Sequence, residues 1–259
     1  MSCTVPPLRR FHIYCYYTSR AAATPASVSL LLLLYIAPRG MVDRKRKRLP
    51  AEVTAGGATE VTAVSVAPAP SSSSFSVFVL GGQEVFRGGP VSAVLRRSTK
   101  GAWEEDSLLA ETRTAPGAAL FNDGLVVVGG AGTGPTPANR KATVEVLPLS
   151  AVGAKGRQAT IKAPALTSPR MAPGVAVAGN ALWAVGGCNG KRVLKTTEFL
   201  LPGAGAWAPG PDLPMHGRFG SATVAAGPNL IITCGGRGGG DVMLRSADVL
   251  RVVSGAALF

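Results

Sequence analysis

Three arginines recur along the C-terminal part of the chain, and they are its most regular candidates for chemistry. Arg113 and Arg170 are 57 residues apart, and Arg218 follows after another 48 residues. A guanidinium carries five donors in a fixed plane, so such a residue either binds an anion or bridges backbone carbonyl groups. Because the arginines recur at regular intervals, we predict that they bridge carbonyls between repeated units. Anion binding is the alternative.

Acidic side chains and histidine do not assemble a catalytic set. The stretch "WEEDS" (Trp103–Ser107) contains three adjacent carboxylates. Neighbours on one strand point apart, whereas a glycosidase needs carboxylates that face each other, so we expect a solvated surface here. All four tyrosines lie within the first 35 residues, which removes a tyrosine nucleophile from an arginine cluster. His216 is the only histidine beyond residue 12 and is expected in a solvated loop. We therefore predict no catalytic residues, metal ligands or cofactor.

Two further features could bind a ligand, and neither matches the required pattern. The run "GGRGGGD" (Gly235–Asp241) is rich in amides that could cradle an anion. It lacks the Lys-Ser/Thr pair of a phosphate-binding loop and a following helix, so a loop between strands is expected. The cysteines form no CxxC motif, and we expect buried free thiols. They are Cys3, Cys15, Cys188 and Cys234.

The elements that would position these residues are marked by four glycine pairs. Each pair follows a short apolar run, and the runs read "FSVFVL", "GLVVV", "NALWAV" and "NLIITC". Runs of this length and composition predict buried strands rather than helices. Their first glycines are 48, 57 and 49 residues apart, so the chain repeats a unit of about 50 residues. The pairs are Gly81-Gly82, Gly129-Gly130, Gly186-Gly187 and Gly235-Gly236.

Other residues keep register with the glycine pairs. The arginines precede the last three pairs by 16, 16 and 17 residues, and Glu145, Glu198 and Asp248 share one slot in the following strand. Trp103 and Trp207 follow their first glycines by 22 and 21 residues and begin a further strand. Each unit is thus predicted to be a four-stranded antiparallel sheet. Such sheets hide both apolar faces by stacking radially into a propeller, and glycine permits the sharp exit from the second strand.

These motifs resemble the kelch-repeat family of β-propellers. The likeness covers residues from about 60 to 253 and is closest over Pro209–Gly236. The chain departs from the family pattern in four ways. The third strands have no tyrosine, the second unit has no tryptophan near Gln158, and the first has Ser65 in place of the arginine. The fourth unit is also expected to stop at Phe259 before a fourth strand.

The resemblance implies an all-β propeller domain over residues 59–259, with about four blades visible. Family propellers mostly have more blades. The blades could therefore be part of a larger propeller cut short, a closed ring of four, or an open arc that pairs with another chain. The stretch "TEVTAVSVA" (Thr59–Ala67) is expected to be the first strand of blade one, or else to complete the last blade.

The family also implies a non-catalytic scaffold that presents loops to a protein partner. The variable loops span Gln83–Pro90, Ala131–Lys141, Cys188–Lys195 and Arg237–Val242, and their cations suit an acidic partner. An enzyme acting on a sugar or other small molecule is one alternative, and a partial gene product without independent function is another. The candidate partner-binding residues are Arg87, Arg140, Lys141, Lys191, Arg192 and Arg237.

The N-terminal residues differ from the rest of the chain. Of the net charge of +13, residues 1–50 hold nine Lys/Arg and one acid, which is +8, and residues 51–259 hold the remaining +5. We predict that residues 1–58 form a disordered tail and that the propeller does not bind nucleic acid. The apolar run Ser27–Ala37 is too short for a stable membrane span, which needs about 20 residues. It could be a secretory signal core. If translation starts at Met41, "RKRKR" (Arg44–Arg48) suits a nuclear or cytoplasmic protein.

Overall fold

The computed structural model describes residues 64–68, 75–82, 89–98, 103–134, 136–152, 160–253 and 256–258. This part of the chain contains sixteen β-strands and three short 3₁₀ helices but no α-helix. The predicted all-β fold is therefore confirmed. Residues 1–58, with the Ser27–Ala37 and Arg44–Arg48 segments, lie outside the described residues. No helix in the described ranges is long and apolar enough to cross a membrane.

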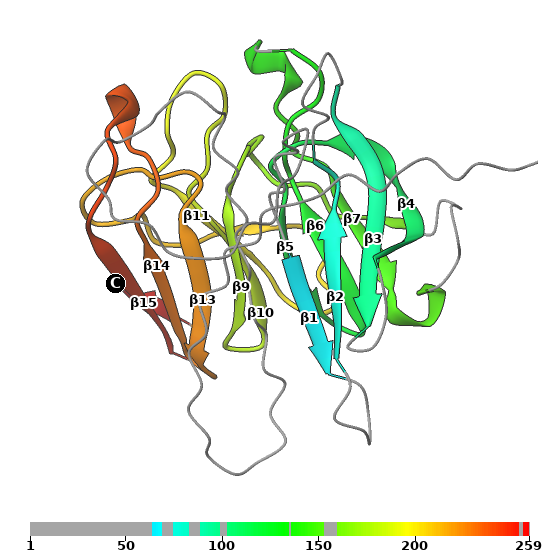
Figure 1. Ribbon diagram of the computed structural model, residues 1–259. Helices are drawn as coiled ribbons and strands as arrows, with labels where there is room; N and C mark the ends of the chain where they lie inside the picture. The colour runs from blue at the N-terminus through cyan, green and yellow to red at the C-terminus, as the bar shows by residue number, and fades with distance from the viewer. Residues whose placement is uncertain are drawn as a thin grey trace, which may run out of the picture.

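The strands form four antiparallel sheets of four strands each, and each sheet is a blade whose strands follow chain order (Figure 1). Blade one contains β1 (Val64–Pro68), β2 (Phe75–Leu80), β3 (Val91–Ser98) and β4 (Glu104–Arg113). Blade two contains β5 (Gly117–Phe121), β6 (Gly124–Val128), β7 (Val144–Pro148) and β8 (Ile161–Ala163). Blade three contains β9 (Gly174–Ala178), β10 (Ala181–Val185), β11 (Thr197–Leu200) and β12 (Ala208–Pro209). Blade four contains β13 (Ala222–Gly227), β14 (Leu230–Cys234), β15 (Ala247–Val253) and β16 (Ala256–Leu258). The 3₁₀ helices are η1 (Pro137–Asn139), η2 (Leu149–Ala151) and η3 (Gly239–Asp241).

Tight turns join the first two strands of blades two and three. Asn122 and Asp123 have φ of 48° and 55°, and Gly179 and Asn180 have φ of 59° and 57°. Two successive residues with positive φ define the hairpin turn whose twist matches that of the flanking strands, and Asn, Asp and Gly adopt it most readily. Both turns lie within the four-stranded antiparallel sheets that the sequence predicts.

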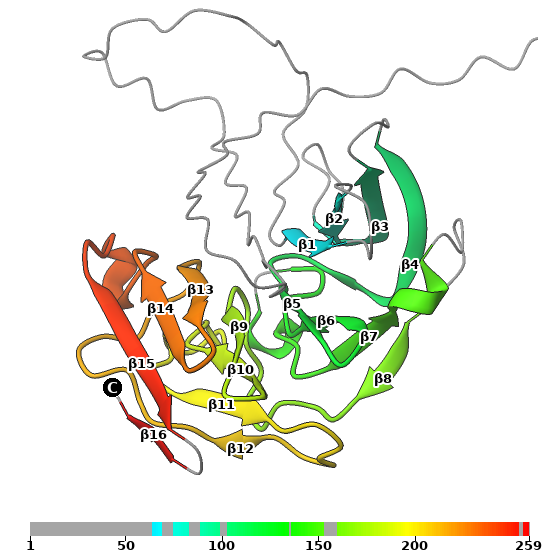
Figure 2. The same cartoon turned by 90° about the horizontal axis from the view of Figure 1, so that it is seen from below.

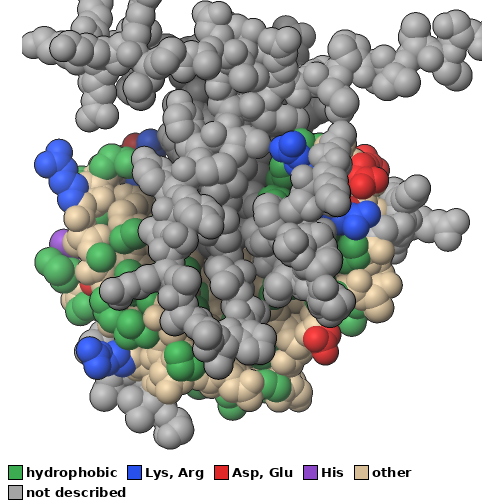
Figure 3. Space-filling view, turned by 60° about the horizontal axis from the view of Figure 1, so that its bottom comes forward, with side chains coloured by type: hydrophobic (Ala, Val, Ile, Leu, Met, Phe, Trp, Pro, Cys, Tyr) green, Lys and Arg blue, Asp and Glu red, His purple; other side chains and the backbone are tan. Residues whose placement is uncertain are grey.

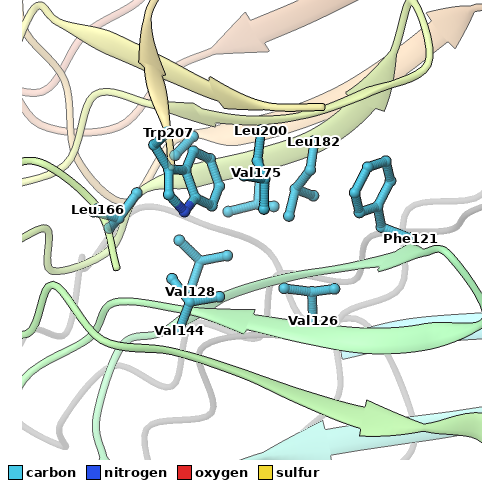
Figure 4. Close-up of a cluster of buried hydrophobic side chains, with 10 residues drawn as sticks. Phe121, Val126, Val128, Val144, Leu166, Val175, Leu182, Leu200 and Trp207 are labelled. Carbon is cyan, nitrogen blue, oxygen red and sulfur yellow. The ribbon is translucent and has the colours of Figure 1, made fainter. Parts of the chain in front are cut away.

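The hydrophobic core lies between neighbouring blades. Alternate residues of a strand point to opposite faces, so each blade has a leading face toward the next blade and a trailing face toward the previous one. Figure 4 shows the leading face of blade two, with Val126 and Val128, against the trailing face of blade three, with Leu182, Leu200 and Trp207. Because blades two and three are covered on both faces, every residue of β6 and β10 is buried.

The four blades are arranged as an arc, and blades one and four form its two ends (Figure 2). The innermost strands β1, β5, β9 and β13 contact one another in that order. Of the three arrangements that the sequence left open, the described residues do not form a closed ring of four blades.

Two expectations about the ends of the blades are resolved by strand pairing. Strand β1 pairs with β2, so the described part of Thr59–Ala67 is the first strand of blade one and does not complete the last blade. The expectation that the fourth unit lacks a fourth strand is wrong, because β16 pairs with β15 through Val252 and Ala257. Strand β16 is only three residues long, which is too short for the sequence pattern to reveal it.

Candidate functional site

Beneath the loops, each recurring arginine is buried at the junction between two blades. Arg113 ends β4 of blade one, and its Nη1 donates to carbonyl oxygens of blade two, at 2.6 Å to Gly129 and 2.8 Å to Thr143. Arg170 repeats this geometry one blade further on, at 2.6 Å to Gly186 and 2.8 Å to Thr196. The side chain therefore attaches the chain segment leaving one blade to the second and third strands of the next blade.

A buried carboxylate neutralises each of these guanidinium groups. Nε and Nη2 of Arg113 donate to Glu145 Oε1 at 2.9 and 2.6 Å, and Arg170 makes the same pair of bonds to Glu198 at 2.9 and 2.8 Å. Burial lowers the pKa of Arg170, and the charge of Glu198 opposes that shift. The second oxygen of Glu198 accepts from the amide of Thr167 at 2.6 Å. A buried pair of this kind is stable only with such supporting bonds.

The junction before blade four has a shorter acid. Nη2 of Arg218 donates to Asp248, and Nη1 donates to the carbonyl of Gly235 at 2.8 Å. Arg218 Nε is buried and has no hydrogen-bond partner among the described residues. Aspartate is one methylene shorter than glutamate, which explains why it reaches one nitrogen of the guanidinium and not two. The sequence shows that Glu145, Glu198 and Asp248 occupy equivalent positions in the repeats, but it did not predict that they pair with the arginines.

The second glycine of three pairs forms a hydrogen bond with the backbone of the same arginines. The amides of Gly82, Gly130 and Gly187 donate to the carbonyl oxygens of Arg113, Arg170 and Arg218 at 2.7, 2.8 and 2.8 Å. A Cβ on Gly129, which has φ of +64°, would lie 2.3 Å from the Arg170 oxygen. The pair is thus glycine both for its left-handed backbone and for this close approach. Each arginine joins two blades, with its carbonyl on one and its guanidinium on the next.

The two tryptophans occupy equivalent places just before a fourth strand. Trp207 precedes β12, is 4% exposed and donates from Nε1 to the carbonyl of Pro164 at 2.8 Å. Trp103 precedes β4 and is only partly buried, against Val77, Val79 and Leu95. The difference arises because blade two covers Trp207, whereas Trp103 lies at the end of the arc.

The loops between the second and third strands lie along one edge of the blades, uppermost in Figure 1. Two of the predicted partner-binding cations are already paired there: Lys141 with Glu111 at 2.5 Å, and Arg237 with Asp241 at 2.8 Å. Burial by itself would raise the pKa of Glu111, but the hydrogen bond from Lys141 and the charges of Arg113 and Lys141 outweigh it and lower the pKa. Arg87 lies outside the described residues.

The remaining three candidates lie in adjacent loops of blades two and three. Lys191 and Arg192 are exposed, and Arg140 is half-buried. None of them has an ion pair within the described ranges. A Cβ built on Gly190 would lie 3.3 Å from Arg140 Cγ, which shows how closely the two loops pack. We call Arg140, Lys191 and Arg192 the basic rim patch.

Hydrogen bonds order the loop that carries two members of this patch. Asn189 Oδ1 accepts from the amides of Lys191 and Arg192 at 3.0 and 2.9 Å. The amide of Gly190 donates to Cys188 Sγ at 3.3 Å, and Cys188 pairs with Val193 across the loop. These hydrogen bonds therefore fix the backbone that carries both cations.

Two expectations about single residues are wrong. Asp106 of "WEEDS" is buried rather than solvated, because its carboxylate lies 2.9 Å from Arg96 Nε, while Glu104 and Glu105 are exposed.

Cys188 is half-buried and Cys234 is exposed, whereas the sequence predicted buried thiols. Cys234 points to the leading face of blade four, which has no following blade among the described residues. The other two cysteines lie outside the described residues.

On the side of the hairpin turns, a cavity of about 810 Å³ opens between blades three and four. Asn180, Asn229 and Arg251 are its larger polar lining residues, and no carboxylate lines it. Within the described ranges, no three His, Cys, Asp or Glu side chains gather as metal ligands would.

The radial stack of four-stranded blades with a repeated glycine–arginine junction defines a β-propeller protein. Residues 169–214 match the family model described as the Kelch motif, and this match supports a propeller of the kelch-repeat type. The matched segment runs through blade three and includes Arg170, the Gly186-Gly187 pair, Glu198 and Trp207. Kelch motifs are typical of protein-interaction propellers. A comparison with curated proteins finds no match.

Proposed function

We propose that this chain is a non-catalytic scaffold whose basic rim patch binds an acidic segment of a protein partner. The observation that carries the proposal is the placement of Arg140, Lys191 and Arg192. They come from two blades, meet at one rim and have no carboxylate partner among the described residues. Charges left unpaired on an ordered surface attract and orient a partner of opposite sign.

The frame under the patch supports this role. The Arg170–Glu198 pair and the hydrogen bonds of Asn189 hold the two loops in place. A preformed surface loses little conformational entropy on binding, so more of the contact energy appears as affinity. Exposed ion pairs contribute about 0–1 kcal/mol each. Three cations alone therefore give a weak, salt-sensitive contact, and a specific partner would add contacts along the rim.

The test compares the double variant Arg140→Glu/Arg192→Glu with Lys162→Glu, which reverses an exposed charge on β8 away from the rim. The probe is a fluorescein-labelled poly-glutamate peptide, followed by fluorescence anisotropy at low and physiological salt. We expect the rim variant to bind about tenfold more weakly than wild type, and Lys162→Glu to bind nearly as well as wild type.

The five cations of Arg44–Arg48 could bind the same peptide, so every measurement is repeated with these residues changed to serine. If the rim variant and Lys162→Glu bind equally in that background, the rim does not recognise acidic segments and the proposal is wrong. Affinity capture with the same proteins then looks for a stoichiometric partner that is lost only with the rim variant.

A further inference from the structure

The leading face of blade four is apolar and uncovered. In β14, Ile231 and Thr233 point toward blade three and are buried, whereas Ile232 is half-buried and Cys234 is exposed. Val224 pairs with Ile232 on one side, and Val249 pairs with it on the other. Both valines are 41% exposed. Equivalent positions in the other blades, such as Val126 and Val128, are buried against the next blade.

The glycine pair of blade four has the geometry of a junction without its partner. Gly235 and Gly236 keep φ of +64° and +82°, as in the other pairs. A Cβ on Gly186 would lie 2.4 Å from the carbonyl oxygen of Arg218, in the segment that leads to the next blade, but the nearest described atom to a Cβ on Gly235 is Leu244 O at 3.9 Å. Among the described residues, the amide of Gly236 has no counterpart to the bond from Gly187 to Arg218.

The other end of the arc presents the complementary face. Val77, Leu95 and Trp103 lie on the trailing face of blade one and are partly buried around Val79. The corresponding tryptophan of blade three, Trp207, is buried because the leading face of blade two packs on it. Each of the three junctions within the chain joins a leading face to a trailing face, and one face of each kind has no blade against it among the described residues.

We propose that the blade-four flank (Val224, Ile232, Cys234 and Val249) binds the blade-one flank (Val77, Val79, Leu95 and Trp103) of a second copy of this chain. The contact repeats the leading-to-trailing packing that the chain already uses three times. Because every copy of the chain carries both flanks, a second copy presents a blade-one flank to the blade-four flank of the first. In Figure 3, hydrophobic side chains are visible at the left, the side on which blade four lies in Figure 1.

This pairing has a definite symmetry. A contact between two different surfaces is heterologous, and it either closes into a ring or continues as an open chain. Two arcs that pair at both ends form a closed dimer in which neither flank is left exposed. Buried apolar area of this kind is the main source of association free energy, and exposed contiguous apolar patches commonly mark such contacts.

Sedimentation equilibrium of the full-length chain tests the association. We expect twice the monomer mass of 26.3 kDa at tens of micromolar protein. Val249→Glu places a charge on the blade-four flank at an exposed site and should give a monomer with unchanged circular dichroism. Val242→Glu, at a 58% exposed rim position off the flank, is the matched control and should remain a dimer. A monomeric wild-type protein, or a Val249→Glu dimer as tight as wild type, overturns the proposal.

Mixing separates head-to-tail pairing from a contact between two identical flanks. Val249→Glu keeps the blade-one flank, and Val77→Glu keeps the blade-four flank, so each alone should be monomeric and their mixture should form a heterodimer. Trp103→Ser replaces Val77→Glu if that variant does not fold. Two monomeric variants that stay monomeric when mixed rule out the head-to-tail contact.

Cysteine labelling gives an independent readout. Cys234 lies in the proposed contact, so peptide mapping after maleimide treatment should show fast labelling in Val249→Glu and slow labelling in the wild-type dimer. Slow labelling in the monomer would mean that something else covers the flank, and it would contradict the proposal. None of these variants touches the basic rim patch, so this inference and the proposed function can fail separately.

Discussion

Gly130 follows the second strand of blade two, and its amide donates a 2.8 Å hydrogen bond to the carbonyl oxygen of Arg170, which lies in the segment that leaves the same blade. The guanidinium of the same arginine reaches forward and donates to the carbonyl of Gly186 at 2.6 Å. One residue thus connects two glycine pairs, and the connection recurs with Arg113 and Arg218. These hydrogen bonds link each blade to the next along the arc.

Gly186→Ala should destabilise the fold by about 2–4 kcal/mol. The new Cβ would lie 2.4 Å from the Arg218 oxygen at a residue with φ of +63°, so a steric clash adds to the backbone strain. Gly235→Ala, compared in the monomeric Val249→Glu background, is the matched control, because Gly235 has nearly the same φ but a Cβ there meets no described atom closer than 3.9 Å. It should cost only the strain, about 1 kcal/mol. Equal losses in urea unfolding would show that the clash does not exist.

Arg170→Met should lose about 3–5 kcal/mol of unfolding free energy, since it leaves Glu198 buried without its counter-charge. The double variant Arg170→Met/Glu198→Leu removes both charges and should be more stable than Arg170→Met alone. A thermodynamic cycle measured by urea denaturation checks this. Independent, additive effects of the two substitutions would contradict the direct pairing.

Asp248→Glu should stabilise the protein by about 0.5–1.5 kcal/mol, because the longer side chain can reach the unpaired Nε of Arg218 as Glu198 reaches that of Arg170. Glu198→Asp makes the reverse change in blade three and should destabilise by a similar amount. Thermal unfolding of both variants decides the point. Destabilisation by both substitutions would mean that side-chain length does not explain the orphaned nitrogen.

The ion pair of Glu111 with Lys141 should make stability pH-dependent. The folded-state pKa of Glu111 lies below its ordinary value of 4.5, so the folded protein binds this proton less readily than the unfolded chain. The stabilisation is therefore present above about pH 4.5 and is lost as the pH falls through the lowered pKa. Glu111→Gln should be less stable than wild type at pH 7, and the gap should close in acid. A gap that widens in acid would contradict the assigned sign.

The fold was accessible from sequence because its determinants are local and repeated. The apolar run before Gly186-Gly187 has the length and composition of a buried strand, and four such runs in register predict stacked sheets. The pairing of Arg170 with Glu198 was less accessible, since nothing in either residue's own neighbourhood identifies the other across 28 positions. Their constant slots in each repeat were the available signal.

The candidate site was harder to predict from the sequence than the fold. Sequence pointed to the loop cations as a group but could not separate Lys141, paired with Glu111, from Lys191, which has no described partner. That distinction depends on which residue of a neighbouring blade faces each loop. The same reasoning placed Asp106 on the surface, because its contact with Arg96 depends on an irregular register between β3 and β4.

Amide hydrogen exchange at the second glycine of each pair tests the central claim most directly. It is measured by NMR on the monomeric Val249→Glu variant, where no second copy covers blade four. We predict slow exchange at Gly82, Gly130 and Gly187, whose amides donate to the carbonyl oxygens of Arg113, Arg170 and Arg218. We predict fast exchange at Gly236. Equal protection at all four glycines, or fast exchange at the first three, would contradict the arginine-linked arc.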